Sequence, residues 1–282
     1  MPGTLFVVAT PIGNLDDLTF RALRTLKQVD LIAAEDTRRT SRLLARYEVR
    51  KPLVSLREHN EARETPRLLD RIRAGESVAL VSDAGTPGIS DPGSRLVHAA
   101  RAAHLPVLAI PGPSAITAAL STSGVPADEF VFMGFPPRSG KAREDWFERF
   151  ARETRTVVFF EAPHRIGRTL TEVASVKQPI YVHRELTKVH ETLVICPDST
   201  AVSGVPPKGE FTVVVPPPGK GPEQHDESAS FELFSSLVAG TPMPRATAIR
   251  LTALAGGVTE KAIAKVVKKR QILAKRQSDT ST

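Results

Sequence analysis

The feature that most constrains the fold is a repeated alternation, over residues 1–124, of short apolar runs with segments of helical periodicity. The runs TLFVVA, DLIAAE, SVALVS and PVLAI are followed by LTFRALRTLKQV, TRRTSRLLARY, GSRLVHAARAA and SAITAALSTSG. Short runs that are apolar almost throughout are typical of strands covered on both faces. The alternation therefore predicts a parallel or mostly parallel sheet with helices on its faces, an α/β lobe.

A second set of elements, assigned to residues 125–218, follows a different pattern of strands and helices. FVFMGF, RTVVFFEA, PIYVHREL and FTVVVPP are predicted strands, and GKAREDWFERFARE and HRIGRTLTEVA are predicted helices. Its shorter and less regular elements predict a second α/β lobe with a mixed sheet. Two lobes joined near residue 125 create a cleft, and clefts between lobes are preferred ligand sites.

The chain beyond the second lobe is predicted to be a linker and a basic helical extension. Residues 219–229 lie in a Pro, Gly and Ser-rich stretch typical of linkers, and residues 230–282 contain two helical patterns separated by Gly256 and Gly257, with Thr259 able to cap the second. Residues 258–282 carry seven basic and two acidic side chains, most of the net charge of +7. This distribution favours an anionic partner.

Several classes of protein are excluded or disfavoured by what the sequence lacks. One cysteine, Cys196, cannot form a disulfide or a cysteine zinc site within one chain. The first residues do not resemble a signal peptide, and no apolar run approaches the length of a membrane span, so we expect a cytoplasmic protein that does not bind membranes. Residues 134–142 fail the P-loop pattern, no G-x-G-x-x-G follows a strand, and no spacing indicates a metal site.

Seven loops rich in Gly, Pro, Ser and acidic residues follow predicted strands. Open α/β sheets bind ligands beyond the carboxyl ends of their strands, which is where these loops lie. LVSDAGTPGISDPG is the longest, and we expect Asp83 to accept hydrogen bonds from a ligand there, with Asp91 as a turn or helix cap. The loops are ATPIGNLDD, AAEDTRRT, LVSDAGTPGISDPG, IPGPSA, FFEAPHR, HRELTK and KGEFT.

The combination of EDTRRT, SDAGTP and RELTK, with VATPIGNLDDLTFRAL, IPGPSAITAALSTSG, FFEAPHRI and KGEFTVVV, resembles the small-subunit ribosomal RNA methyltransferases of the tetrapyrrole-methylase-like class. The resemblance runs from about Thr4 to Pro216 and continues weakly through the predicted C-terminal helices. It implies two α/β lobes, an S-adenosyl-L-methionine cofactor folded in the cleft, a homodimer, and small-subunit ribosomal RNA or the 30S subunit as partner. The implied reaction is 2′-O-methylation of a cytidine ribose in the decoding region of 16S rRNA.

The resemblance also implies a set of cofactor-binding residues in the cleft loops. Gly88 and the pair Ala162 and Pro163 depart from the commoner pattern in two of these loops. The implied residues are Pro11, Asp83, Ala84, Gly85, Ile89, Ser90, Ser114, Ala115, Glu161, Ala162, Leu186, Glu210, Phe211 and Thr212.

A ribose hydroxyl is a poor nucleophile, so methyl transfer to it needs a general base. The candidates are Glu35, Asp36, Glu185 and Glu191. Glu185 is favoured because Arg184 and Lys188 flank it, although the same residues could form an ion-pair network that orders a strand end.

Cations beside the predicted cleft are the candidates for binding substrate phosphates. Arg38 and Arg39 could contact RNA at the start of a helix, or could pair with the neighbouring acids Glu35 and Asp36. The full predicted set is Arg38, Arg39, Arg165, Arg184 and Lys188.

Two other functions compete with this interpretation. A tetrapyrrole methyltransferase of the same fold would not need the basic tail or the arginine pairs. A non-catalytic RNA-binding protein would depend on aromatic stacking, whereas aromatic residues make up 5% of this chain.

Overall fold

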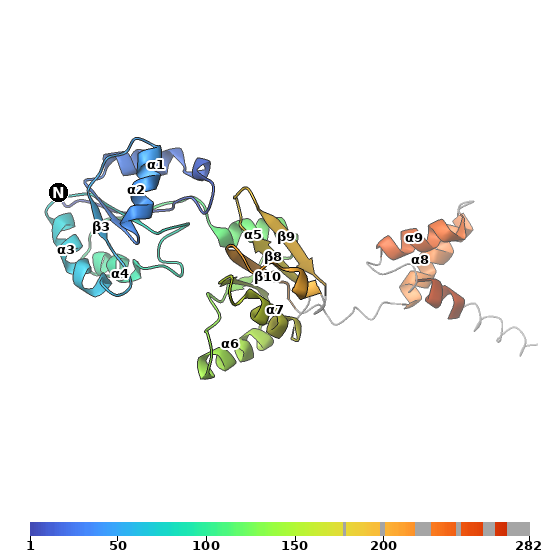
Figure 1. Ribbon diagram of the computed structural model, residues 1–282. Helices are drawn as coiled ribbons and strands as arrows, with labels where there is room; N and C mark the ends of the chain where they lie inside the picture. The colour runs from blue at the N-terminus through green and yellow to red at the C-terminus, as the bar shows by residue number, and fades with distance from the viewer. Residues whose placement is uncertain (177–178, 198–200, 218–226, 241–243, 256–262, 270–282) are drawn as a thin grey trace, which may run out of the picture. The chain divides into compact units, whose positions relative to one another are not determined.

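We describe residues 1–176, 179–197, 201–217, 227–240, 244–255 and 263–269 of a computed structural model (Figure 1). The chain divides into two compact units, Met1–Pro217 and Pro218–Thr282, and each is described by itself. Among the helices in these ranges, none combines the length and the apolar character that crossing a bilayer requires.

The first sheet of unit 1 is parallel throughout, as the alternation predicts. Its strand order is β3-β2-β4-β1-β5, and Leu5 of β1 pairs with Val78 on one side and Val107 on the other. The strands are β1 (Leu5–Val8), β2 (Leu31–Ala34), β3 (Leu53–Ser55), β4 (Val78–Val81) and β5 (Val107–Ile110).

Helices cover both faces of this sheet, so its strands are buried (Figure 1). One face packs against α1 (Phe20–Gln28) and α2 (Thr37–Arg46) through a cluster that includes Leu26 and Leu44. The other face packs against α3 (Glu61–Arg73) and α4 (Ser94–Ala102). A short 3₁₀ helix, Leu15–Asp17, precedes α1.

The second sheet is mixed, as expected. Its order is β6-β7-β10-β8-β9, with β6 and β7 parallel and the other pairs antiparallel. Helices α6 (Lys141–Arg152) and α7 (Ile166–Ala174) pack on one face around Trp146 and Phe150. The remaining elements are β6 (Phe130–Phe132), β7 (Thr156–Glu161), β8 (Ile180–Arg184), β9 (Thr192–Cys196), β10 (Phe211–Val215) and a 3₁₀ helix, Ala201–Gly204.

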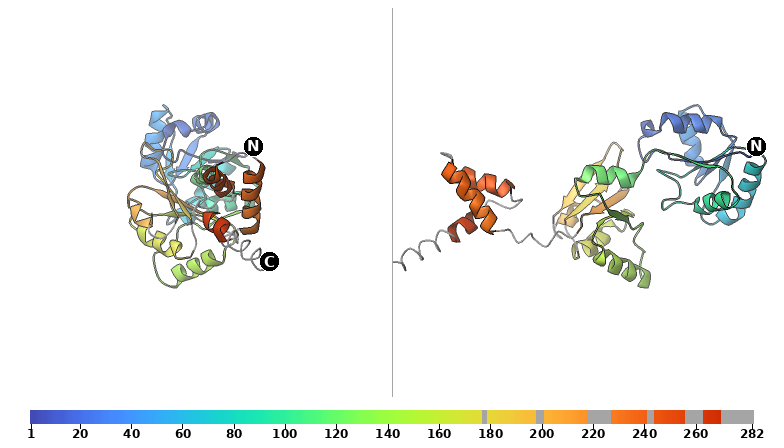
Figure 2. Two further views of the ribbon diagram at one scale, coloured as in Figure 1. Left: turned by 90° about the vertical axis from the view of Figure 1, so that its right-hand side faces the viewer. Right: turned by 180° about the vertical axis from the view of Figure 1, so that it is seen from behind.

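Helix α5 (Ala115–Ser123) covers the other face of the second sheet, beside β8 and β10 in both Figure 1 and Figure 2. Its residues Ile116 and Leu120 pack with Val158 and Val214. The predicted boundary at 124/125 assigned this helix to the first lobe, because its sequence follows β5 directly. Its apolar face is instead buried against the second sheet, and its C-terminal cap, Gly124, ends it in a left-handed conformation.

Apart from the two 3₁₀ helices, three elements of unit 1 were not predicted from the sequence. Strand β3 has three residues, so its apolar signal is short. Helix α3 contains Pro66, which normally argues against a helix interior. Strand β9 lies at a sheet edge, and its alternate residues Leu193 and Ile195 are exposed.

Unit 2 contains α8 (Glu227–Gly240), α9 (Arg245–Ala255) and a helical segment at residues 263–269. Phe234, Ala248, Ile263 and Val267 form its small core. Helix α8 begins three residues before the expected start of the extension at 230, and residues 219–226 of the predicted linker lie outside the described residues. Gly256, Gly257 and Thr259 also lie outside them, as do Lys261, Arg270, Lys275 and Arg276 of the basic tail.

Candidate functional site

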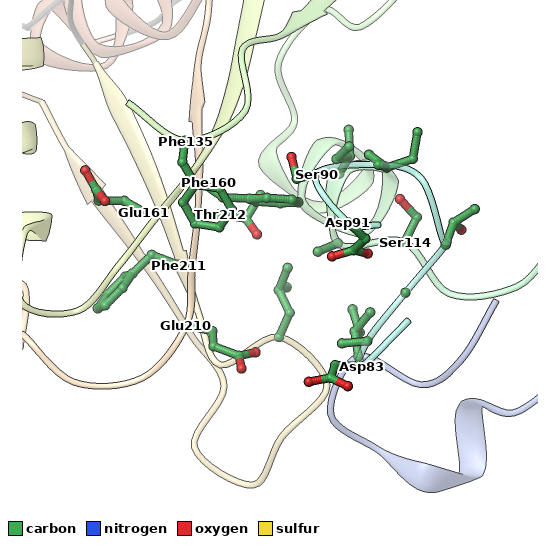
Figure 3. A pocket seen from close by; sticks show the side chains of 18 of the residues that line it. Asp83, Ser90, Asp91, Ser114, Phe135, Phe160, Glu161, Glu210, Phe211 and Thr212 are labelled. Carbon is green, nitrogen blue, oxygen red and sulfur yellow. The ribbon is translucent and has the colours of Figure 1, made fainter. Parts of the chain in front are cut away.

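Unit 1 contains a pocket of about 370 Å³ that is lined by loops of both lobes (Figure 3). Its volume lies within the range of pockets that bind small molecules. The lining residues are Ile12, Glu35, Arg39, Asp83, Ala84, Gly85, Thr86, Ile89, Ser90, Asp91, Ser114, Ala115, Ile116, Phe135, Phe160, Glu161, Ala162, Pro163, Leu186, Glu210, Phe211 and Thr212.

The loops of the first lobe meet here because the carboxyl ends of parallel strands share one edge of the sheet. Backbone hydrogen bonds join Thr10 and Gly85 in both directions, at 2.9 and 3.0 Å. The loop after β2 is tied to the same segment, since the Asp36 amide donates to Asp83 Oδ1 at 2.9 Å and the Asp83 amide donates to Glu35 Oε2 at 3.3 Å. The loops after β1, β2 and β4 therefore form one hydrogen-bonded group.

The loop after β1 also contacts the second lobe. The Asn14 amide donates to Thr187 Oγ1 at 3.0 Å. Gly13 lies so close to the loop after β8 that a Cβ there would come within 2.9 Å of Leu186 O. Only glycine permits this approach, so Gly13 allows the two lobes to close around one side of the pocket.

Two carboxyl groups in the pocket have raised pKa values. Burial, followed by the nearby charge of Glu35, raises the pKa of Asp91 to about 6. Burial also raises the pKa of Glu35, against a hydrogen bond from the Asp83 amide that lowers it. Perturbed carboxyl groups in a pocket are typical of acid–base sites.

Asp91 does not cap a helix, in contrast to one of the sequence interpretations. The carboxylate of Glu61, in α3, caps α4 instead: its Oε1 accepts from the amides of Gly93, Arg95 and Leu96 at 3.0, 2.9 and 3.3 Å. A negative charge at this position satisfies the free amides of the first turn. Asp91 is therefore available to the pocket.

Every residue predicted to bind the cofactor lines the pocket except Pro11. Pro11 is buried, because the backbone pairing of Thr10 with Gly85 turns the chain so that Ile12 lines the pocket in its place. Sequence reasoning did not predict seven lining residues: Ile12, Thr86, Asp91, Ile116, Phe135, Phe160 and Pro163. All but Phe135 lie within the quoted motifs, so proximity to a motif was the available signal for six of them, whereas Phe135 lies at the end of the predicted strand FVFMGF.

Two of the predicted catalytic carboxylates are outside this lining. Glu185 accepts hydrogen bonds from Lys188 Nζ and the Glu210 amide, both at 2.8 Å, and the bond from Lys188 lowers its pKa. Asp36 caps α2, and its hydrogen bonds from Arg38 lower its pKa to about 2. Both contacts favour the ionised form, which makes each carboxylate a weaker base. Glu191, a further candidate, accepts from the Thr187 amide at 2.7 Å.

The predicted substrate-binding cations all have partners within the chain, and only Arg39 lines the pocket. Arg38 pairs with Asp36 at 3.1 Å, and Arg39 with Asp83 at 3.3 Å. The other three have the following partners: Arg165 pairs with Glu161, Arg184 donates to Lys208 O, and Lys188 pairs with Glu185 and Glu210. The described residues contain no group of three or more His, Cys, Asp or Glu side chains placed to hold a metal ion.

Comparison with known proteins agrees with this architecture. The family model described as Tetrapyrrole (Corrin/Porphyrin) Methylases matches residues 4–201. The chain belongs to this family. As a member of the tetrapyrrole methylase family, it shares the methyltransferase character of the group.

Relatives similar over most of their length carry the name "Ribosomal RNA small subunit methyltransferase I". The protein from Xylella fastidiosa is 49% identical over 222 residues, 76% of this chain and 81% of its own. That from Synechocystis is 44% identical over 253 residues, 87% of this chain and 91% of its own. That from Thermotoga maritima is 44% identical over 218 residues, 76% of this chain and 98% of its own.

Solved structures show the same fold at lower sequence similarity. Diphthine synthase superposes with a TM-score of 0.61 at 15% identity, covering 76% of this chain and 90% of its own. Uroporphyrin-III-C-methyltransferase from Thermus thermophilus gives 0.53 at 21% identity, covering 75% and 94%. These two similarities establish the fold alone.

Proposed function

We propose that this protein is an S-adenosyl-L-methionine-dependent methyltransferase that acts in the cytoplasm on the ribose 2′-oxygen of a cytidine in the decoding region of 16S rRNA. The pocket carries the proposal: it combines nearly all of the predicted cofactor-binding residues with a half-buried carboxyl group of raised pKa. The names of the relatives support small-subunit ribosomal RNA as the substrate.

The residues of the pocket fit the proposed cofactor. Carboxylates at Asp83 and Glu210 can accept hydrogen bonds from amino and hydroxyl groups, and attract a positive charge. Apolar side chains at Ile12 and Leu186 supply the wall that a purine ring requires. When bound, S-adenosyl-L-methionine supplies a methyl group activated by a positively charged sulfur.

Asp91 is our candidate for the general base, in place of Glu185. A base is most effective when its pKa lies near the working pH, and a value of about 6 leaves Asp91 mostly ionised at pH 7 while it still binds a proton readily. It would accept the proton of the ribose hydroxyl as the oxygen bonds to the methyl carbon. Glu35 assists by raising the pKa of Asp91 through charge repulsion.

The chain's other contribution is to position the reactants. The hydrogen bonds that join Glu35, Asp36 and Asp83 hold the first-lobe loops together. Orienting two reactants can lower a barrier by about 7–11 kcal/mol, so a fixed pocket contributes much of the acceleration.

Two observations favour RNA over a tetrapyrrole. Arg39 brings an exposed side chain to the pocket. In unit 2, Lys265, Lys268 and Lys269 are exposed on one short helical segment. Exposed cations attract a polyanion, and a tetrapyrrole enzyme does not require them on a separate unit.

The proposal includes a homodimer, implied by the family resemblance. Strand β5 is an edge of the first sheet, and its Leu108 is 53% exposed. Exposed apolar edges are commonly covered by a partner. Light scattering during size-exclusion chromatography tests this component: a mass of about twice 30.5 kDa supports it, and a mass of one chain contradicts it.

The decisive experiment maps ribose methylation in 16S rRNA by mass spectrometry in cells with and without the gene. Purified protein, S-adenosyl-L-methionine and unmethylated small subunits should then restore the missing mark. Loss and restoration of one 2′-O-methylcytidine supports the proposal. A 16S rRNA whose ribose methylation does not depend on the gene contradicts it.

A further inference from the structure

The segment Met133–Pro137, between β6 and α6, is held by a carbonyl contact at four of its five residues. Met133 O accepts from Trp146 Nε1 at 3.0 Å, and Gly134 O from the Phe160 amide at 2.9 Å. Pro136 O and Pro137 O accept from the guanidinium groups of Arg165 and Arg143 at 2.9 and 2.7 Å. We call this segment the clamped loop.

The buried guanidinium of Arg143 makes the hydrogen bonds of the clamped loop energetically costly to break. Arg143 is 4% exposed, and its other nitrogens donate to Thr169 Oγ1 at 3.0 Å and to the carboxylate of Glu172. Removing a partner of a buried charge is strongly destabilising. The two prolines further restrict the backbone. The loop is therefore held in a single conformation.

Phe135 is the residue that the clamped loop presents. Its side chain lines the pocket, yet the residue is 49% exposed. Phe160 lies against part of its ring, with centroids 5.5 Å apart and the planes at 57°, and Phe132 supports Phe160 at 4.9 Å. An aromatic group that is rigidly held, with part of its ring open at a pocket, is suited to stacking on a planar ligand.

The clamped loop lies opposite the segment that carries the candidate base. A Cβ on Gly134 would lie 3.9 Å from Ser90 Oγ, and Ser90 precedes Asp91. Figure 3 shows Phe135 and Phe160 together on the side of the pocket facing Ser90 and Asp91. Gly134 and Ser90 both have left-handed backbones, with φ of 64° and 62°. A non-glycine residue in this region is strained, and such strain concentrates at functional sites.

We propose that Phe135 stacks on the base of the nucleotide to be methylated and thereby holds its ribose at Asp91. This inference rests on the proposed function. A target nucleotide enters from outside the protein, so it meets the exposed ring at the rim. Single-stranded nucleotides are recognised by stacking on aromatic side chains, which suits the few but well-placed aromatic residues here.

The test measures methyl transfer to unmethylated small subunits by Phe135→Ala, Phe135→Leu and Phe135→Trp in the full chain. Phe135→Ala should raise KM for subunits roughly 5- to 150-fold, which corresponds to the loss of about 1–3 kcal/mol of stacking. Phe135→Trp should have a KM for subunits near the wild-type value. Phe135→Leu, which has apolar bulk but no ring, should have a raised KM. Phe20→Ala is the matched control, since Phe20 is 92% exposed on α1 and lies outside the pocket.

The affinity for S-adenosyl-L-methionine, measured by calorimetry, shows whether the ring of Phe135 stacks on the cofactor or on the target nucleotide. It should be unchanged in all variants. A weaker affinity for the cofactor with an unchanged KM for subunits assigns the ring to the cofactor and overturns the inference, as does a leucine variant that works like wild type. If the wild-type protein methylates no small-subunit RNA, the proposed function fails, and this inference fails with it. A working wild type with an unaffected Phe135→Ala variant overturns the inference alone.

Discussion

The hydroxyl of Ser123 in α5 and the imidazole Nε2 of His183 in β8 lie 2.8 Å apart in a buried contact. Ser123 Oγ also donates to Ala119 O at 2.7 Å, so it uses its one hydrogen there. The hydroxyl must therefore accept the Nε2 hydrogen of a neutral His183. This bond fixes the C-terminal turn of α5 to the second sheet.

Ser123→Ala is expected to lower the free energy of unfolding by about 1–3 kcal/mol, because it leaves the Nε2 hydrogen of His183 buried without its acceptor. Urea denaturation measures the change. Thr122→Ala is the control, since Thr122 is exposed on the same helix and bonds only to carbonyls of its own turn. An equal effect of both substitutions would contradict the role of the bond.

The same contact predicts a pH dependence of stability. Burial lowers the pKa of His183, while Glu191 opposes this shift. Below about pH 6.5 the unfolded chain therefore binds a proton that the folded chain does not, so stability falls as the pH drops through that range and is constant above it. His183→Gln should remove this part of the pH dependence. The measurement is the change in unfolding free energy between pH 7.5 and pH 5.5, compared between the wild type and the variant.

Glu61→Ala is expected to destabilise unit 1 by about 1.5–3 kcal/mol, the range for hydrogen bonds to a charged group. It removes the acceptor of three amides at the start of α4, where the longest pocket loop ends. The affinity for the cofactor should also fall, and Glu61→Gln should retain part of the stability and part of the affinity. Glu58→Ala, at an exposed position, should change neither the melting curve nor the calorimetric titration.

The sequence predicted those parts of the fold whose signal is local. Four of the five strands of the first sheet are continuous apolar runs, and the parallel sheet follows from their alternation with helices. The packing of α5 on the second sheet could not be predicted in this way. It depends on contacts of Ile116 and Leu120 with strands far along the chain, which no local pattern records.

The same distinction between local signals and contacts of distant residues applies to the pocket. Motifs predicted most of its lining, because loops after parallel strands meet at one edge. What the motifs could not predict is which acid lines the pocket with a raised pKa. Asp91 resembles a helix cap in sequence, and Glu185 resembles a base, but contacts from residues far along the chain reverse these interpretations: Glu61 with the start of α4, and the Glu210 amide with Glu185. The ion pair of Glu185 with Lys188 is local, and it is the alternative that the sequence offered.

Asp91→Asn is expected to reduce kcat roughly 10²–10⁴-fold, the usual contribution of a general base. In wild type, kcat should fall as the pH drops through about 6, because protonation removes the base. The variant should lose this acid limb, and its stability at pH 7 should not decrease, because a charge that burial disfavours has been removed. Asp70→Asn, exposed on α3, is the control. A variant with near-normal turnover would exclude Asp91 as the base.

Glu185→Gln is expected to leave turnover near the wild-type level. The substitution removes a partly exposed ion pair with Lys188, and such pairs contribute about 0–1 kcal/mol. Single-turnover methyl transfer distinguishes the two interpretations of this residue, since loss of a general base would slow the reaction by two orders of magnitude or more. Glu191→Gln in the same loop is the comparison. A large loss of the methyl-transfer rate confined to Glu185→Gln would identify Glu185 as the base.

The double substitution Lys265→Gln and Lys268→Gln in unit 2 is expected to weaken binding to small-subunit RNA mainly at low salt. Both side chains are exposed, and each phosphate contact that is lost should reduce the slope of log affinity against log salt by about 0.7–0.9. Affinity for S-adenosyl-L-methionine should not change, since the pocket lies wholly in unit 1. The control pair Arg21→Gln and Lys27→Gln removes the same charge from exposed positions on α1. Filter binding over a salt series gives both slopes, and equal slopes for the two double variants would contradict a specific role of the C-terminal helices.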